Sequence, residues 1–212
     1  MSEMIADPRQ RASLAKSLAD AIDGLVSDQY GGLHEEPDIT SRIGQRLEDR
    51  FDERQVGGHT LRVITQTIPS HGPNSLEKPL GTDLYIAFSV QPHGGLPIRK
   101  GLLIQAKRQE KLGLDWSDLR EQCRRMNLVT QKGSVVWLYG PNGVATMRAP
   151  DVTKNRTVAM PLSQMLDQVF RCWIGDKRKV PGTGHPDRAV LREMLETLGA
   201  KNGILLKMKE KA

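Results

Sequence analysis

The spacing of apolar residues alternates between two values along the chain, and this alternation restricts the chain to folds in which helices pack on a β-sheet. Intervals of three and four residues place side chains on one face of a helix. Intervals of two place them on one face of a strand. The helical segments are about residues 9–27, 39–51, 115–130, 161–174 and 187–199, and the strand-like segments are 61–68, 83–90, 101–107, 134–140 and 144–148. We therefore expect an α/β domain.

The order of these segments predicts one structural domain with three parts. The chain has 212 residues, of which 38% are hydrophobic, which is enough to bury a single core. We expect an N-terminal helical extension at 1–32, a core at 33–150 and a C-terminal helical extension at 151–212. The core has the order helix, three strands, helix, strand pair, and its three consecutive strands are expected to form a β-meander. The tail at 201–212 is either a short edge strand or a frayed end.

Positive charge is concentrated in one region of the sequence. The chain has 31 Lys and Arg against 25 Asp and Glu, a net charge of +6, and its pI is about 9.4. Residues 97–132 carry nine basic and four acidic side chains. A basic surface favours a polyanionic partner such as DNA, although this argument concerns association and leaves the fold undecided.

The spacing of cysteines and histidines argues against a disulfide framework and a zinc site. Cys123 and Cys172 form no CxxC pair, and the five histidines form no HxH or HxxxH pair. The first ten residues are polar, and no apolar run approaches the roughly 20 residues that span a bilayer. We expect a cytoplasmic protein with no signal peptide, no membrane anchor and no membrane partner.

Three polar side chains interrupt two of the apolar strands. Asp83 opens the second strand, and Gln105 and Lys107 share one face near the end of the third. If these strands are antiparallel, the loop between them joins their far ends and brings Asp83 beside Lys107. A carboxylate and an amide oxygen are ligands for Mg²⁺, and an ammonium group can hold an attacking water. These residues therefore predict a metal-and-water site at one end of the sheet.

A fourth polar group is expected from the helix that precedes the sheet. Glu36 stands seven and eleven residues before Ile43 and Leu47, on the helix face that packs toward the sheet. A carboxylate at the start of a helix also stabilises it by about 0.3–1 kcal/mol without any other role. Glu35 is an equally placed acid, and we prefer Glu36 modestly.

The combination of these motifs resembles the PD-(D/E)XK nuclease superfamily. An acidic helix start, 36-EPDIT-40, is followed by GxD, 81-GTD-83, and then by an apolar strand that closes in QxK, 105-QAK-107. The glutamine-bearing form, here within LIQAKR, is similar to that of Mrr-type restriction endonucleases and related defence nucleases. The resemblance covers roughly residues 33–150 and implies a restriction-endonuclease-like αβββαβ core with a central mixed sheet.

The resemblance implies metal-dependent hydrolysis of DNA phosphodiesters, with Mg²⁺ as the cofactor and Mn²⁺ as a substitute, in a restriction, anti-phage defence or repair system. It makes Glu36 the acid that supports the metal or its waters and Asp83 the principal metal ligand. Gln105 becomes a ligand or positions water, and Lys107 orients the nucleophilic water. The backbone carbonyl of Ala106 completes the metal site.

Nucleic-acid contacts are expected from the end of the catalytic strand and from the helix that follows it. The candidates are Arg108, Arg120, Gln122 and Arg124. Gln122 falls where relatives in this superfamily often carry a glutamine near the active site. A solvated helix face is the usual explanation of a run of charges, and contact with phosphates is the functional one.

Gln105 stands where the commonest form of the motif has Glu. The exchange removes one negative charge and weakens metal binding unless Glu36 or phosphate oxygens compensate. A rival interpretation is therefore a nuclease-fold subunit with weak or no activity that binds nucleic acid or docks on a helicase or ATPase partner. A hydrolase of RNA or nucleotides is a third candidate. Cleavage of both DNA strands would require a homodimer or a second event.

Overall fold

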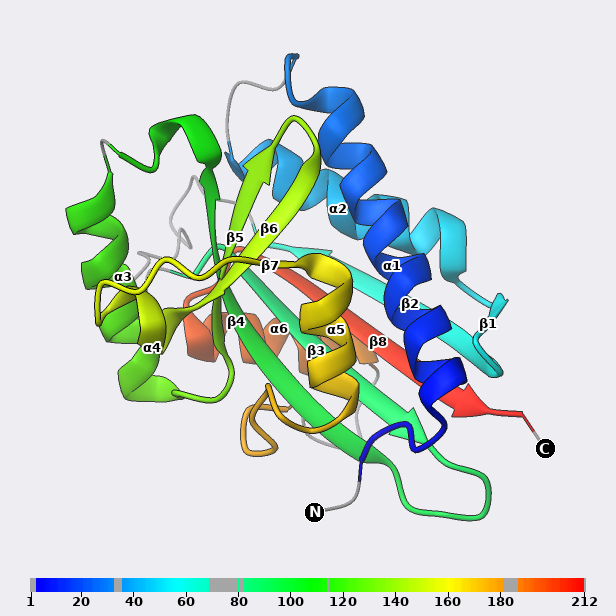
Figure 1. The fold of residues 1–212 in the computed structure, drawn as a ribbon. Helices are drawn as coiled ribbons and strands as arrows, with labels where there is room; N and C mark the ends of the chain where they lie inside the picture. Colours follow the sequence, from blue (N-terminus) through cyan, green and yellow to red (C-terminus); the bar gives the residue numbers. More distant parts are fainter. Residues whose placement is uncertain are drawn as a thin grey trace.

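The structure is a computed structural model that describes residues 3–32, 36–68, 80, 82–113, 115–180 and 187–211. It has the α/β architecture expected from the sequence, with one curled, mixed sheet between two groups of helices (Figure 1). Its helices are α1 (Pro8–Gln29), α2 (Glu36–Phe51), α3 (Trp116–Val129), α4 (Ala149–Val152), α5 (Leu162–Phe170) and α6 (Asp187–Leu198), with a 3-10 turn at Gln109–Lys111. Its strands are β1 (Gln55–Val56), β2 (His59–Thr67), β3 (Leu84–Gln91), β4 (Ile98–Arg108), β5 (Ser134–Gly140), β6 (Gly143–Arg148), β7 (Met160–Pro161) and β8 (Asn202–Glu210).

The strands that the structure describes form one eight-stranded sheet in the order β1-β2-β8-β3-β4-β5-β6-β7. The pairs β8/β3 and β4/β5 are parallel, and the remaining neighbours are antiparallel. The expected antiparallel pair of β3 and β4 is confirmed, as is the hairpin of β5 and β6. In that hairpin Gly143 has a φ of +105°, a conformation that disfavours other residues.

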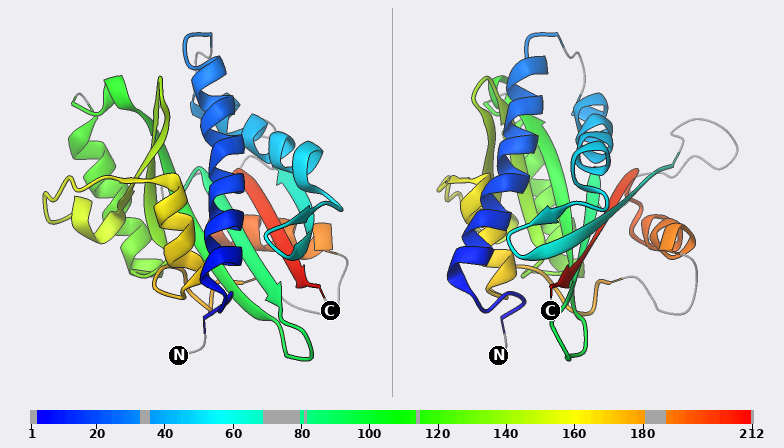
Figure 2. Two further views of the ribbon diagram at one scale, coloured as in Figure 1. Left: turned by 45° about the vertical axis from the view of Figure 1, so that its right-hand side comes forward. Right: turned by 90° about the vertical axis from the view of Figure 1, so that its right-hand side faces the viewer.

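The two faces of the sheet are covered by different helices, because side chains alternate along each strand. Even-numbered residues of β3 and β4, such as Ile86 and Ile104, pack with α1, α2 and α5. Odd-numbered residues, such as Tyr85 and Leu103, pack with α6, and the same face of β5 packs with α3 and α4. The right-hand view of Figure 2 shows α1 and α6 on opposite sides of β8. We call the first surface the α1 face and the second the α6 face.

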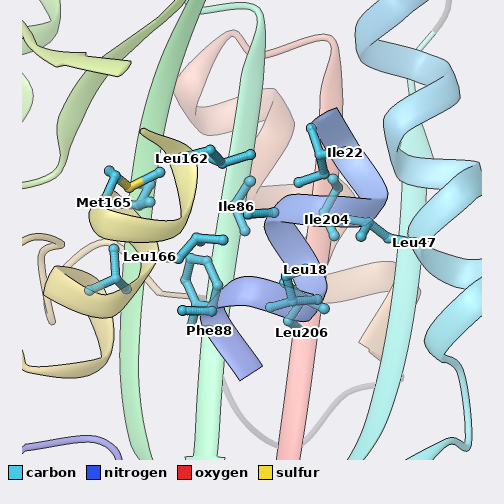
Figure 3. Packing of buried hydrophobic residues seen from close by; sticks show 14 of the residues in the cluster. Leu18, Ile22, Leu47, Ile86, Phe88, Leu162, Met165, Leu166, Ile204 and Leu206 are labelled. Atoms are coloured by element: carbon cyan, nitrogen blue, oxygen red, sulfur yellow. The ribbon is translucent and has the colours of Figure 1, made fainter. Parts of the chain in front are cut away.

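The core on the α1 face is large and fixes the sheet on which the polar residues stand. Phe88 of β3 meets Phe170 of α5 edge to face, with ring centroids 5.7 Å apart. Figure 3 shows residues of this core from α1, α2, α5, β3 and β8, among them Leu18, Ile22, Leu47, Ile86, Leu162, Met165, Leu166, Ile204 and Leu206. The helix α1 is held at its start by the Asp7 side chain, which accepts hydrogen bonds from the backbone N–H groups of Arg9 and Gln10 at 2.7 and 3.0 Å.

The last strand departs from the expectation for the C-terminal segment. Residues Asn202–Glu210 form neither an edge strand nor a frayed end; they lie between β2 and β3 in the middle of the sheet. The three consecutive strands therefore do not form a simple meander, because β2 and β3 are both paired with β8. The segment 151–212 accordingly contributes helices and also an interior strand.

Some residues discussed above lie outside the described part of the chain. These are Glu35, Gly81 of the GxD motif, most of the loop that joins β2 to β3, and residues 181–186. Within the described part, no helix is both long and apolar enough to cross a bilayer.

An interior position for β8 makes a direct prediction about stability. Leu206 is 2% exposed, so Leu206→Ala should lower the free energy of unfolding by about 2–5 kcal/mol, because it leaves a cavity in the core. Val158→Ala, at a residue that is 72% exposed, should change it by less than about 0.5 kcal/mol. Urea unfolding of both variants measures the difference. Equal, small effects would mean that the tail is not part of the core.

Candidate functional site

Asp83 and Gln105 face each other across two neighbouring strands. The pair Leu84↔Ile104 sets the register, and the Asp83 N–H donates to the Ile104 carbonyl at 2.9 Å. The Asp83 carboxylate oxygen Oδ2 accepts a hydrogen bond from Ala106 N at 3.0 Å and another from Gln105 Nε2. Asp83 is 5% exposed and Gln105 is 4% exposed. The carboxylate is therefore buried and held by donors on β4.

The side-chain amide of Gln105 lies between two oxygen atoms. Its Nε2 donates to the Asp83 carboxylate and, at 3.0 Å, to the backbone carbonyl of Ala106. Its Oε1 is buried and has no hydrogen-bond partner among the described residues. Carboxylate, carbonyl and amide oxygens are the ligands that hard divalent cations prefer. Rotation of the amide by half a turn would direct its unpartnered Oε1 to the point where the other two oxygens converge, which is a donor set suited to Mg²⁺.

The backbone of Asp83 is held from the other side by Asn202, the first residue of β8. The Asn202 N–H and Nδ2 both donate to the Asp83 carbonyl, at 3.3 and 3.4 Å. Its Oδ1 accepts from Thr67 Oγ1 at 3.1 Å. Asn202 thus ties the ends of three strands together beside the carboxylate. No local pattern in the sequence indicated this residue, because its partners are distant in the chain.

Glu36 approaches the same region from the first turn of α2. Its Oε1 accepts a hydrogen bond from Arg108 N, at the end of β4, at 3.2 Å. One turn later, Thr40 Oγ1 donates to the Glu36 carbonyl at 2.8 Å and is 2.9 Å from Tyr139 Oη. The carboxylate of Glu36 is therefore attached to the strand that carries Gln105.

The pKa of the Tyr139 phenol is affected by burial and by the charges of two nearby carboxylates. Burial raises the pKa of Tyr139 above its ordinary range, the hydrogen bond with Thr40 lowers it, and the negative charges of Asp83 and Glu36 raise it further. The two carboxylates therefore lie close enough to the same phenol to act on it together. The printed contacts of Glu36 at this end of the sheet are with Arg108 N and with Thr40, which reaches Tyr139.

Lys107 lies on the face of β4 that carries Gln105, but its observed partner differs from the one expected. The register places Asp83 opposite Gln105, so Lys107 lies two residues further along β4, beyond the residue that faces Asp83. Its Nζ is 3.3 Å from the carboxylate of Asp115, the residue before α3. The expectation that Asp83 lies directly beside Lys107 assumed that the two strand ends coincide, whereas β4 extends beyond the start of β3.

Arg108 is engaged within the protein. Its guanidinium lies 4.7 Å from the centre of the Tyr30 ring, donates to the Tyr30 carbonyl at 3.2 Å and pairs with Glu110 at 2.7 Å. These contacts connect the end of β4 to the end of α1. Arg108 is therefore a structural link in this state, in addition to any contact with nucleic acid.

The expected nucleic-acid residues of α3 fall into two groups. Arg124 is exposed and pairs with Glu121 at 3.1 Å, and hydrogen bonds from Arg124 and then Arg125 hold the pKa of Glu121 below its usual range. This arrangement is that of a solvated helix face. Arg120 and Gln122 are half-buried, and the Nε of Arg120 and the Oε1 of Gln122 are buried without a hydrogen-bond partner among the described residues.

A polar cavity adjoins the site on the α2 side. It has a volume of about 290 Å³ and lies between α2 and the strands β2 and β8. Thr40 and Asn202, which contact Tyr139 and Asp83, are part of its lining, together with Thr67 and Arg42. The cavity is lined by hydroxyl, amide and guanidinium groups and adjoins the backbone of Asp83 through Asn202.

The described residues contain no group of three or more His, Cys, Asp or Glu side chains placed to hold a metal ion. A metal at this site would therefore depend on the glutamine and on a backbone carbonyl as well as on Asp83. Comparison with known proteins adds no relative: no protein-family model matches the chain, and no curated protein or solved structure is significantly similar to it.

The contact between Gln105 and Asp83 can be tested by exchanging the amide for a carboxylate. Gln105→Glu removes a donor to Asp83 and places two buried carboxylates together, so we expect a loss of about 1–3 kcal/mol of stability at pH 7 without metal. The loss should shrink as the pH falls, because the raised pKa of the new pair lets one carboxyl fold in its protonated form. Mg²⁺ or Mn²⁺ should raise the Tm of this variant more than that of the wild type.

The matched control is Gln131→Glu, in an exposed turn. Thermal unfolding with EDTA and with each metal, at pH 5 and pH 7, measures all three proteins. If Gln105→Glu and Gln131→Glu behave alike, the amide does not lie against the carboxylate.

Proposed function

We propose that the chain is a metal-dependent DNA endonuclease of the PD-(D/E)XK type. The observation that carries this proposal is the convergence of the Asp83 carboxylate and the Ala106 carbonyl on the Gln105 amide, with Lys107 next on the same strand. The order of the main elements from α2 to β5, helix, three strands, helix, strand, is compatible with this family. The net charge of +6 supports a polyanionic substrate.

The residues present fit Mg²⁺, with Mn²⁺ as a substitute. Asp83, the Ala106 carbonyl and a rotated Gln105 would supply oxygen ligands, and Glu36 would bind the metal or its waters. When bound, such a metal generates a water nucleophile at neutral pH and stabilises negative charge on the phosphate. Because Asp83 and Gln105 are buried, a cation bound there would be shielded from bulk water and would interact more strongly with the carboxylate.

Lys107 is assigned to the reacting water and phosphate. Its Nζ pairs with the carboxylate of Asp115, which fixes the direction of the side chain. An ammonium group so held can orient a water molecule and stabilise the charge that develops on the phosphate oxygens. Asp115 is therefore a positioning residue in this proposal, and Asn202 has the same role for Asp83.

A second candidate function follows from the glutamine. With Gln105 in place of an acid, the site has one negative charge fewer, and its metal affinity depends more strongly on Glu36 and on the substrate phosphate. A nuclease-fold subunit with weak or no activity would retain nucleic-acid binding, or would dock on a helicase or ATPase. Cleavage of both strands by an active form would require a homodimer or a second binding event.

Activity measurements distinguish the two functions. Supercoiled and linear DNA are incubated with the wild type in Mg²⁺, in Mn²⁺ and in EDTA. We expect cleavage only with metal, and a loss of about 10²–10³-fold or more in Asp83→Ala and Lys107→Ala, because each removes a group that stabilises the transition state. Asp49→Asn, on the exposed side of α2, is the matched control and should retain full activity.

The binding of the same DNA is measured beside its cleavage. If the wild type and both variants are equally inert in every metal while they still bind DNA, the chain is a binding subunit and the catalytic proposal is wrong. If RNA is cleaved and DNA is not, the substrate class is wrong while the site is retained.

A further inference from the structure

On the α6 face of the sheet, one row of residues across β2, β8, β3 and β4 is mainly apolar, and in the next row three of the four residues are basic. Ile64, Leu205, Ala87 and Gly101 are cross-strand neighbours from β2 to β4, and the first three belong to the core beneath α6. The next row toward the far end of the sheet, on the same face, consists of Arg62, Lys207, Ser89 and Arg99. We call this second set the basic row.

The basic row lies on a hollow of the surface. A groove of about 560 Å³ is lined by its four residues and by Lys209, Thr60 and Gln91, and Glu53 is the one acidic side chain among the described residues that line it. Lys207 pairs with Asp187 at the start of α6, at 2.9 Å. In the described part of the chain, Arg62, Arg99 and Lys209 form no ion pair. The groove therefore carries a net positive charge.

The arrangement is unfavourable for the sheet by itself. Arg62 and Lys207 are directly opposite each other on antiparallel strands, and like charges in this position destabilise a sheet. Basic residues often protect an edge strand from pairing with other molecules, but β8, β3 and β4 are interior strands. Asp187 offsets the charge of one lysine. An anionic ligand would offset the remainder.

Further basic groups lie beside the row. The segment that follows α5 crosses this face, since Gly101 N donates to the Asp176 carbonyl at 3.0 Å and Tyr85 Oη donates to the Lys179 carbonyl at 2.8 Å. Lys177 and Arg178 in this segment are exposed; Arg178 pairs with Asp176 at 2.9 Å, so Lys177 is the one that adds positive charge. Gly101 belongs to the row of residues next to the one that contains Arg99. The segment therefore continues the positive surface beyond β4.

We infer that the basic row is a binding surface for the phosphate backbone of a nucleic acid, separate from the Asp83 site. Three inter-strand steps of about 4.8 Å separate Arg62 from Arg99, or about 14 Å in all. A nucleic-acid strand carries one phosphate per 3.4 Å of duplex axis, so the row matches about four nucleotides. Ser89 lies six residues from Asp83 along β3, or about 20 Å. The ligand class is shared with the proposed function, whereas the surface is new.

The test measures binding to labelled duplex and single-stranded DNA in EDTA, where cleavage cannot contribute, between about 50 and 200 mM salt. For Arg62→Gln/Arg99→Gln we expect at least about tenfold weaker binding to duplex, and a salt slope shallower by about 1.8, which is about 0.9 for each lost contact. The melting temperature should not fall, because the exchange relieves repulsion in the sheet.

The matched control is Arg9→Gln/Arg156→Gln, which removes the same charge from two exposed positions elsewhere. Its affinity should stay within about twofold of the wild type. If the first double variant is unstable, Arg62→Gln/Lys209→Gln takes its place, since Lys209 is exposed on the same groove. Equal losses of affinity in the basic-row and control variants would mean that only the net charge matters. Unchanged affinity in both would mean that the basic row does not bind DNA. Either result overturns the inference.

Two further outcomes separate this inference from the proposed function. Weak binding by the basic-row variant in a protein that never cleaves DNA supports the surface and rejects the nuclease. Full cleavage at saturating DNA by that same variant shows that the Asp83 site works without the row. If the wild type binds anionic phospholipid vesicles through Arg62 and Arg99 but does not bind DNA, the ligand is a membrane surface and the inference is wrong.

Discussion

The sheet depends on the backbone pairing of β8, the last described strand, with β2 and β3, which lie much earlier in the sequence. Thr67 and Asn202 are 135 residues apart, and Asp83 and Asn202 are 119 apart, yet both pairs are joined by hydrogen bonds. Without β8, the facing sides of β2 and β3 would have to find other partners for their N–H and C=O groups. The strand therefore completes the core and also holds the peptide of Asp83 in place.

The same strand connects the two functional regions that we infer. Its first residue, Asn202, binds the backbone of Asp83, and Lys207 and Lys209 near its end belong to the basic groove. Between them, Leu205 lies in the core under α6 while Leu206 faces α1. A single extended segment thus presents polar groups at both ends and apolar groups in the middle. The proposed binding surface and the candidate site are therefore connected by one strand, β8.

The elements with a strong local period could be predicted from the sequence, and the pairing of distant strands could not. Ile39, Ile43 and Leu47 indicated α2, and the antiparallel pair of β3 and β4 followed from one short loop. The position of the C-terminal segment was ambiguous, because its apolar run, Ile204–Leu206, does not indicate which strands it pairs with. Its place in the middle of the sheet depends on contacts separated by more than a hundred residues.

The site residues named from the sequence stay a prediction, and the structure shows contacts among them that the sequence did not indicate. Asp83 and Gln105 lie together because the strands are antiparallel. Since β4 extends beyond the start of β3, the residue that faces Asp83 is Gln105 and not Lys107. Arg108 was expected to meet nucleic acid, and its contacts with Tyr30 and Glu110 come from segments that no local pattern connects. The basic row was not foreseen for the same reason, because its members are contributed by four strands.

The geometry of the α6 face limits how one nucleic acid could use both regions. By the alternation of β3 and β4, Asp83, Gln105 and Lys107 point to the same face as Ser89 and Arg99. The row and the acid are about 20 Å apart along the sheet, close to six base pairs of duplex at 3.4 Å each. The middle of this path is covered by α6, whose residues Leu191 and Leu195 pack on the sheet. A backbone that touches both ends must therefore pass over α6 or bend around it, and otherwise the two regions hold different segments of the nucleic acid.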